Sequence, residues 1–382
     1  MSNRADFDKM CPPGMRIFLC GDVMLGRGID QALPCPCAPG LYEEAMESAV
    51  GYLRLAERAN GPILRPLNFS DVWGAAMEEW SRMQPHARVI NLETSITRSD
   101  AYDPKGINYR MSPENAGCLT AAAFDCCVLA NNHVLDWGRA GLLDTLARLE
   151  QLHIKTAGAG RDLRQASAPA ILEIAGHGRL IVLSFALVTS GVPRTWAAKA
   201  DAAGVNLLPA LSRAVVGAIA DQVDQIREPK DVIIVSIHWG PNWGYEITEE
   251  QRWFAHELIE RGGISILHGH SSHHAKAIEV YKNRLILYGC GDFLNDYEGI
   301  SGHEEFRDDL ALMYFAHIDP ASADLVELEM VPLQIRRFQL IRASHVDVSW
   351  LQQTLDRDSQ RLGARVSFRS DGRLTLSWAR VV

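Results

Sequence analysis

Residues 16–27, RIFLCGDVMLGR, decide the fold of this chain. A short apolar run over residues 16–20 changes abruptly to glycine and a carboxylate at Gly21 and Asp22. A continuous apolar run of this length is typical of a strand buried on both faces. The pattern therefore predicts a buried strand with Asp22 directly after its end.

Further segments along the chain repeat this apolar character. They are residues 88–92, 126–130, 180–185, 232–237 and 264–267. Between several of them the apolar residues have helical spacing, in segments 41–59, 70–83, 113–122, 139–150, 211–227 and 248–261. Alternation of buried strands with amphipathic helices predicts a layered α/β fold.

The pattern changes after residue 263. Segments 277–281 and 284–288 flank Lys282-Asn283, which predicts a hairpin, and residues 310–318 and 325–335 add further strands. We also expect a helix at 347–362 and a hairpin that turns at Asp371-Gly372. The predicted organisation is a tail at 1–14, a main domain at 15–318, and C-terminal strands, helix and hairpin at 319–382 that pack on it.

Composition narrows the choice of partners. The 382 residues carry a formal net charge of -9, and no run is dense in lysine or arginine. A protein that binds phosphate backbones normally presents a basic face, so nucleic acid is not an expected partner. The N-terminal residues have no apolar run of signal-peptide length and no later run reaches membrane-spanning length, so we expect a cytoplasmic protein without a membrane anchor. The oligomeric state stays open.

Polar side chains of the kinds that bind metals follow directly after the predicted strands. These groups are Gly21-Asp22, Asn91-Leu92-Glu93, Asn131-Asn132-His133, His238-Trp239-Gly240 and His268-Gly269-His270. Any one of them could cap a helix or stabilise a turn. Strand ends meet at one edge of a sheet, however, and carboxylate, amide and imidazole groups together form the ligand set of Mn, Zn, Fe or Ca. The sequence predicts a divalent metal site with one or two ions per chain.

Four histidines lie within residues 268–274. Imidazoles must be neutral to bind a metal, and four charged rings would repel one another. Some of them must therefore face away from the ion, and His274 is the expected one. His133 follows Asn132 directly, and since neighbouring residues seldom both reach one ion, His133 is expected to transfer protons with Asp136 as its orienting partner.

These motifs resemble those of the CapA family, known from poly-gamma-glutamate and capsule synthesis, within the calcineurin-like metallophosphoesterase superfamily. The resemblance spans about residues 15–318 and rests on GDVMLGR, NLETSIT, ANNHVLDWG, GAGRDLRQA, IHWG, HGHSSH and ILYGCGDF. It implies a four-layer α/β/β/α sandwich with mixed sheets. It also implies roles by position: His133 as the catalytic histidine, Asp136 as its partner, and a metal shell of Asp22, Glu93, Asn132, His238, His270 and His273.

The chain departs from the superfamily pattern at two positions. Met24 stands where the phosphatases carry a histidine that completes one of two metal sites, so a single metal is an alternative to two. Asp292 stands in Gly291-Asp292-Phe293, where the family usually has asparagine, and it adds a carboxylate. Paired with a histidine, Asp292 is predicted to be catalytic, because two His/Asp pairs beside a metal suit proton removal and return at a carbon next to a carbonyl.

The expected function is a CapA-like, metal-dependent enzyme that acts on a peptide or small amide-type substrate by acid–base chemistry. It either hydrolyses a bond or inverts an α-carbon, as in the lasso-peptide epimerases that share this fold. A dinuclear-metal phosphoesterase is one alternative. A non-catalytic protein of capsule or poly-gamma-glutamate assembly is the other.

Overall fold

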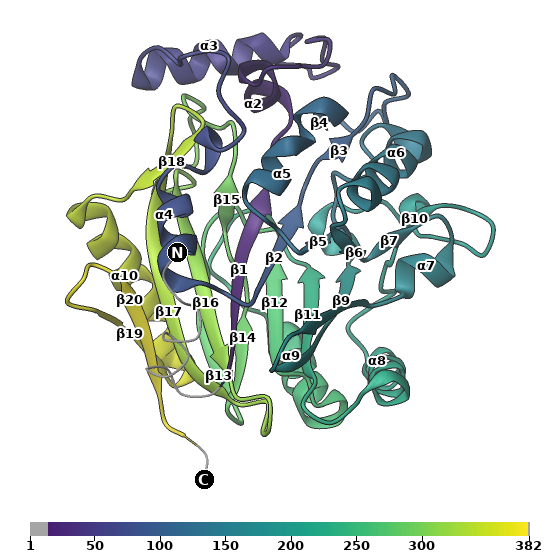
Figure 1. Cartoon of the computed structure of the whole chain (residues 1–382), viewed down its shortest axis with the longest axis vertical. Coiled ribbons are helices and arrows are strands. Elements are labelled where there is room, and N and C mark those ends of the chain that lie inside the picture. The colour runs from purple at the N-terminus through teal and green to yellow at the C-terminus, as the bar shows by residue number, and fades with distance from the viewer. Residues whose placement is uncertain (1–13, 381–382) are drawn as a thin grey trace.

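The computed structural model describes residues 14–380, so of the predicted tail at 1–14 only Gly14 lies within the described residues. A ten-stranded sheet has β1 near its middle, in the order β19-β20-β17-β16-β1-β2-β5-β6, with β15 paired to β1 and β18 to β17 (Figure 1). Its strands are β1 (Met15–Val23), β2 (Ala87–Leu92), β5 (Cys126–Val128), β6 (Lys155–Ala157), β15 (Asp292–Leu294), β16 (Leu310–Ile318), β17 (Leu325–Arg336), β18 (Gln339–Arg342), β19 (Ala364–Phe368) and β20 (Leu374–Trp378). Strand β1 runs parallel to β2 and β15 and antiparallel to β16, so this sheet is mixed.

A second sheet of six strands has the order β13-β14-β12-β11-β9-β8. Its strands are β8 (Ala170–Ile174), β9 (Gly178–Ala186), β11 (Val232–His238), β12 (Ile266–His270), β13 (Ile278–Tyr281) and β14 (Arg284–Leu287). Strands β9, β11, β12 and β14 are parallel, and β8 and β13 pair antiparallel at the two edges. Two small sheets, β3 (Ser95–Ile96) with β4 (Arg110–Met111) and β7 (Ala159–Gly160) with β10 (Gly204–Val205), lie in the connecting segments.

The side chains of β1 show how the layers are stacked. Ile17 and Leu19 belong to a core that contains residues of both large sheets, whereas Phe18 and Cys20 belong to a core shared with the helices. On that outer face pack α4 (Ala75–Met83), α5 (Gly117–Ala121) and α6 (Gly138–Gln151). The six-stranded sheet is covered in turn by α8 (Arg213–Ile226) and α9 (Glu249–Gly262). The predicted α/β sandwich is therefore confirmed, with helices on the outside and two sheets within.

Three of the predicted helices differ from the observed ones. The helix expected at 113–122 is a 3₁₀ turn at Pro113–Ala116 followed by the short α5. The helix expected at 41–59 is α3 (Ala49–Asn60), which begins later because the segment before it is loop that carries Glu43 against Arg27. The helix expected at 70–83 divides into a 3₁₀ turn at Asp71–Trp73 and α4, because Gly74 has a φ of 41° and a Cβ there would lie 2.2 Å from Leu340 O. Short elements that the sequence did not predict include α2 (Arg27–Ala32), α7 (Leu163–Ser167) and β15.

The C-terminal third follows the predicted pattern closely. Lys282 and Asn283 have φ values of 48° and 62°, the left-handed conformations of the tight turn that joins β13 to β14. The helix α10 (His345–Ser359) and the hairpin β19–β20 are also present, and β20 pairs with β17. Residues after 318 thus continue the ten-stranded sheet, and the division at residue 318 stays a prediction.

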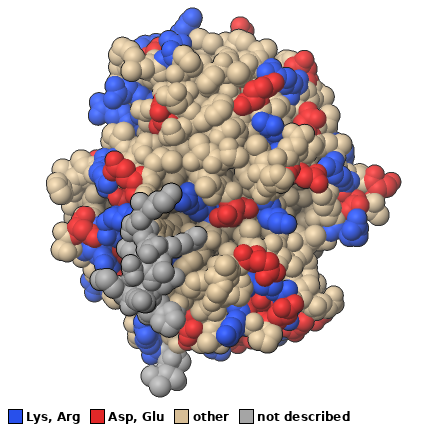
Figure 2. Space-filling view, viewed as in Figure 1, with Lys and Arg blue, Asp and Glu red and all other residues tan. Residues whose placement is uncertain are grey.

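Charged side chains of both signs are mixed on the surface. On the face shown in Figure 2, lysines and arginines lie among aspartates and glutamates around the margin and across the lower half, while uncharged residues fill much of the upper centre. Within residues 14–380, no helix combines the length and the apolar character needed to cross a lipid bilayer.

Candidate metal centre

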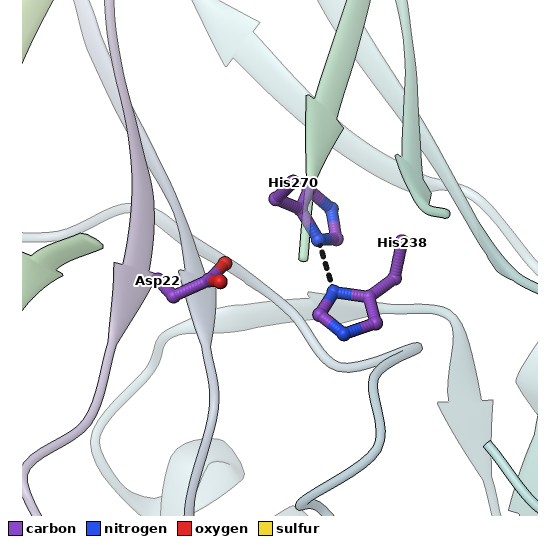
Figure 3. Close-up of side chains that lie close together, drawn as sticks. All are labelled: Asp22, His238 and His270. Carbon is purple, nitrogen blue, oxygen red and sulfur yellow. Dashed lines mark hydrogen bonds between the residues drawn. The ribbon is translucent and has the colours of Figure 1, made fainter. Parts of the chain in front are cut away.

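Three buried ligand-type side chains meet where strands of the two sheets end. Asp22 is the next-to-last residue of β1, and His238 and His270 are the last residues of β11 and β12. One ligand atom from each of the three lies within 4.8 Å of the others. In Figure 3 the carboxylate of Asp22 points toward the two imidazoles. Segments that are more than 200 residues apart along the chain therefore form one donor group.

A second donor group shares Asp22. It contains Asp22, His273 and Asp292, again with one ligand atom from each within 4.8 Å of the others. The parallel pairing of β15 with β1 places Asp292 directly opposite Asp22 in register. His273 Nδ1 lies 2.9 Å from Asp292 Oδ1.

The carboxylates of this centre are almost completely withdrawn from water. Asp22 is 0% exposed, and Glu93 and Asp292 are each 1% exposed. Burial raises the pKa of Asp22 to about 7, with Asp292 contributing further and His273 opposing it. Burial, and next the charge of Asp22, also raise the pKa of Glu93 well above its usual value. Several buried anions in one place are costly unless a cation compensates them.

One carboxylate oxygen of Asp22 lacks a partner within the part of the chain that the structure describes. Asn91 Nδ2 donates to Asp22 Oδ1 at 2.7 Å and to Glu93 Oε2 at 3.0 Å, so this amide holds both carboxylates in place. Asp22 Oδ2 is buried and has no hydrogen-bond partner among the described residues. Buried polar atoms normally have a partner, and a bound cation supplies one for a carboxylate oxygen. The residues present therefore fit a divalent metal ion.

His238 and His270 have the protonation that metal ligands need. Burial lowers the pKa of both rings well below the usual value, and each is lowered further by a neighbouring imidazole. Their Nδ1 atoms are 2.7 Å apart, and Ser236 Oγ lies 2.9 Å from His270 Nε2. A neutral imidazole is the metal-binding form.

Asn132 and Glu93 border this pair. Asn132 Oδ1 lies 3.0 Å from His238 Nε2. Glu93 Oε1 lies 3.9 Å from both His238 Nε2 and His133 Nε2. Every residue of the predicted metal shell is therefore at or beside the two donor groups, while its role as a ligand stays a prediction.

His133 is held by a separate hydrogen-bond network. Its Nδ1 lies 2.6 Å from Asp136 Oδ2, and Asn131 Oδ1 accepts from its backbone N–H at 3.1 Å. With Nδ1 bonded to a carboxylate, Nε2 is the nitrogen left to exchange protons, and this atom is the one that faces Glu93. Burial lowers the pKa of His133 to about 4, although Asp136 opposes the shift. A neutral imidazole at neutral pH can act as a general base.

Lys105 completes this network from the segment between β3 and β4. Its Nζ lies 2.8 Å from Asp136 Oδ1 and also donates to the backbone oxygen of Asn132. The same segment is held by Asp103, whose carboxylate accepts from Trp196 Nε1 at 2.7 Å. The sequence did not predict this ion pair.

The other two histidines of the cluster lie outside both donor groups. His268 Nε2 lies 2.7 Å from Cys20 O, which places it in the core between the sheets. His274 packs against Tyr245 and Phe306, with ring centroids 4.5 Å and 4.7 Å away. His270 and His273 are the members of this segment that reach the centre. The sequence placed Asn91 in one strand-end group with Glu93 but predicted no role for it, and its side chain contacts both Asp22 and Glu93.

Together the fold and this centre define a class: a layered α/β sandwich protein with a buried histidine–carboxylate site suited to divalent cations. The chain belongs to the family of bacterial capsule synthesis proteins called PGA_cap, whose sequence pattern matches residues 16–297. It is 47% identical over 366 residues to a "probable polyglutamine synthesis accessory protein" of Mycobacterium tuberculosis, covering 95% of this chain and 96% of that one.

More distant relatives match a shorter region. A "PGA biosynthesis protein CapA" of Bacillus subtilis is 27% identical over 226 residues, covering 59% of this chain and 56% of that protein. A "capsule biosynthesis protein CapA" of Bacillus anthracis is 25% identical over 238 residues, covering 61% and 53%. The resemblance to the CapA family is thereby confirmed, and the wider relation to the calcineurin-like superfamily stays a prediction.

Proposed function

We propose that this protein is a metal-dependent hydrolase that cleaves an amide bond in a peptide-type substrate, with His133 as its general acid–base group. The observation that carries the proposal is the position of His133 Nε2, 3.9 Å from the buried carboxylate Glu93 that borders His238. A proton-transferring imidazole therefore borders the donor groups. Relatives named for polyglutamine and PGA synthesis support a substrate rich in amide bonds.

The division of labour follows from the contacts. Asp22, Glu93, Asn132, His238, His270 and His273 would hold the metal. A divalent ion, when bound, polarises a carbonyl oxygen and makes a bound water easier to deprotonate. His133 would take a proton through Nε2 and return it to the leaving amine, while Asp136 keeps Nδ1 protonated and the ring oriented.

Inversion of an α-carbon is the second candidate, and the contact between His273 and Asp292 favours it. Those two side chains lie 2.9 Å apart and could form a second proton-transferring pair opposite His133 and Asp136. Their ligand atoms, however, lie within 4.8 Å of Asp22, which favours metal binding over proton transfer. Hydrolysis needs one such pair and is therefore preferred.

A phosphoesterase is the third candidate, because two donor groups that share Asp22 could hold two ions. Two-metal centres serve aminopeptidases as well as phosphatases, so the metal count alone does not separate these reactions. A role in assembly without catalysis leaves the network of His133, Asp136 and Lys105 without a use.

One incubation separates the candidates. The protein, loaded with Mn²⁺, is mixed in deuterium oxide with poly-γ-glutamate and with short α-linked glutamate peptides. We expect new amine termini and no deuterium at an α-carbon. Deuterium at an α-carbon without new termini would show epimerisation in place of hydrolysis. Release of 4-nitrophenol from 4-nitrophenyl phosphate added to the same mixture would favour the phosphoesterase.

Two variants show whether any activity belongs to this centre. His133→Ala is expected to lose turnover. The matched control is His256→Ala, which removes a histidine that also contacts a carboxylate, Glu279 at 3.0 Å, but on α9 and away from the donor groups. Equal activity in the two variants would contradict the proposed role of His133.

A further inference from the structure

We propose that Asp292 is a metal ligand and not a proton carrier, and that it completes with His273 a second divalent-cation site beside the His238–His270 site, with Asp22 shared between them. This inference rests on the proposed metal dependence and extends it, because it assigns a number of ions and a ligand that the sequence reasoning gave another role.

The position of Asp292 follows from the sheet. Strand β15 pairs parallel with β1, and the register sets Asp292 opposite Asp22. The backbone fixes this register, because Asp22 N donates to Gly291 O at 3.0 Å and Met24 N donates to Leu294 O at 2.8 Å. Two carboxylates of like charge are therefore held side by side by the main chain, each at most 1% exposed.

Like-charged buried carboxylates repel each other unless a cation lies between them. Asn295 Nδ2 donates to Asp292 Oδ2 at 2.7 Å, and His273 contacts the other oxygen. These two neighbours orient the carboxylate of Asp292. Asp22 Oδ2, in contrast, has no hydrogen-bond partner among residues 14–380, although it is fully buried. That oxygen is the atom left for a cation shared by the two groups.

A single ion does not serve both groups. The first group has two imidazoles and the second has one imidazole and one more carboxylate, and the only residue common to both is Asp22. One ion bound by His238, His270 and Asp22 would leave His273 as the only positive partner of Asp292 among the described residues, and a protonated His273 cannot bind a metal. Two ions that share a carboxylate satisfy both groups, as in two-metal hydrolytic centres.

The second site also accounts for Met24. A thioether is a soft, weak ligand for Mn²⁺ or Ca²⁺, and Met24 Sδ instead lies 3.8 Å from the hydroxyl of Tyr297. The oxygen that Met24 cannot supply from β1 comes from the neighbouring strand β15 as Asp292. The donor set of the second site, two carboxylates and one imidazole, is harder than that of the first and favours Mn²⁺ over Zn²⁺.

The test counts bound metal. The full chain is freed of metal with a chelator, saturated with Mn²⁺ and desalted, and Mn per chain is measured by plasma mass spectrometry. We expect two ions in the wild type, one in Asp292→Asn, one in His238→Ala and two in the control His256→Ala. Electron paramagnetic resonance should show magnetically coupled Mn²⁺ in the wild type and isolated Mn²⁺ in both single-site variants.

Each other outcome overturns the inference. One ion in the wild type would show that the second site does not exist, and it would leave hydrolysis with one metal untouched. Two ions in Asp292→Asn would show that Asp292 only orients His273, because an amide oxygen can still accept from Nδ1. If Asp292→Asn fails to fold by circular dichroism, His273→Gln takes its place with the same expected loss of one ion.

Discussion

Two histidine–carboxylate pairs lie in this centre, and they differ in what surrounds them. His133 and Asp136 are 2.6 Å apart, and His273 and Asp292 are 2.9 Å apart. Lys105 contacts the first carboxylate, and the pKa of His133 falls to about 4. Burial alone would lower the pKa of His273 as well, but the charges of Asp292 and Asp22 raise it on balance.

A contact between a histidine and a carboxylate therefore does not by itself determine whether the histidine transfers protons or binds a metal. A lysine beside the carboxylate compensates its charge within the protein and leaves the imidazole neutral and free to exchange protons. A second carboxylate beside the other pair leaves an excess of negative charge, which a metal ion can compensate.

Removal of metal should have the largest effect on turnover, because the donor groups around Asp22 are proposed to need a cation. Dialysis against a chelator is expected to abolish turnover, and Mn²⁺ should restore it. Binding to the folded state alone stabilises by about 2.7 kcal/mol at an ion concentration of 100 Kd. The melting temperature measured by scanning calorimetry should therefore fall on chelation. An unchanged melting temperature with full activity would show that the donor groups around Asp22 need no metal for stability or for turnover.

The substitution His133→Ala tests the pair formed by His133 and Asp136. General acid–base catalysis typically contributes about 10²–10⁴-fold, so kcat should fall by that amount. Metal per chain should stay at the wild-type value, because His133 belongs to neither donor group. A variant that loses its metal together with its activity would contradict the separation of the two pairs.

Asp136→Asn tests what orients His133. The amide can present an N–H to Nδ1 and so stabilise the wrong tautomer. We expect kcat to fall, by no more than the roughly 10²–10⁴-fold that general acid–base catalysis contributes. Asp292→Asn should instead lower the metal content per chain. The two Asp→Asn substitutions would thus differ, since one lowers kcat with metal retained and the other loses metal. Loss of metal in Asp136→Asn would remove that contrast.

Lys105→Met should have the smallest effect on rate. Lys105 lowers the pKa of His133, so its removal raises that pKa from about 4. More of the ring is then protonated and unable to accept a proton as the pH falls. The acidic limb of the pH profile of kcat/KM should move to higher pH, so the loss of activity should be greater near pH 5 than near pH 7. A profile identical to the wild type would show that Lys105 only holds its segment in place.

The sequence was most informative where apolar runs are long. Residues 16–20, 88–92 and 232–237 predict buried strands because nothing but a sheet core can accept them, and each lies within an observed strand. Residues 292–294 did not predict β15, since three residues carry too little periodicity. That strand exists because its neighbour β1 offers free backbone groups, which is a tertiary effect.

The same limit applies to the centre. Polar residues after the strands predicted which side chains meet, because strand ends share an edge. The sequence could not show that Asp292 lies beside Asp22, or that Lys105 reaches Asp136 from 31 residues earlier in the chain. Both contacts depend on sheet register and on loop paths, and neither is encoded in local spacing.

The position of β1 between β2 and β16 has a consequence for biosynthesis. The ribosome makes the segment that bears Asp22 long before β15 and β16, the later strands that pair with β1. Until then β1 is an exposed edge that can pair with the wrong strand. The nascent chain therefore cannot bring Asp292 beside Asp22 until β15 has been synthesised, and shielding of the open edge of β1 until then should favour correct pairing.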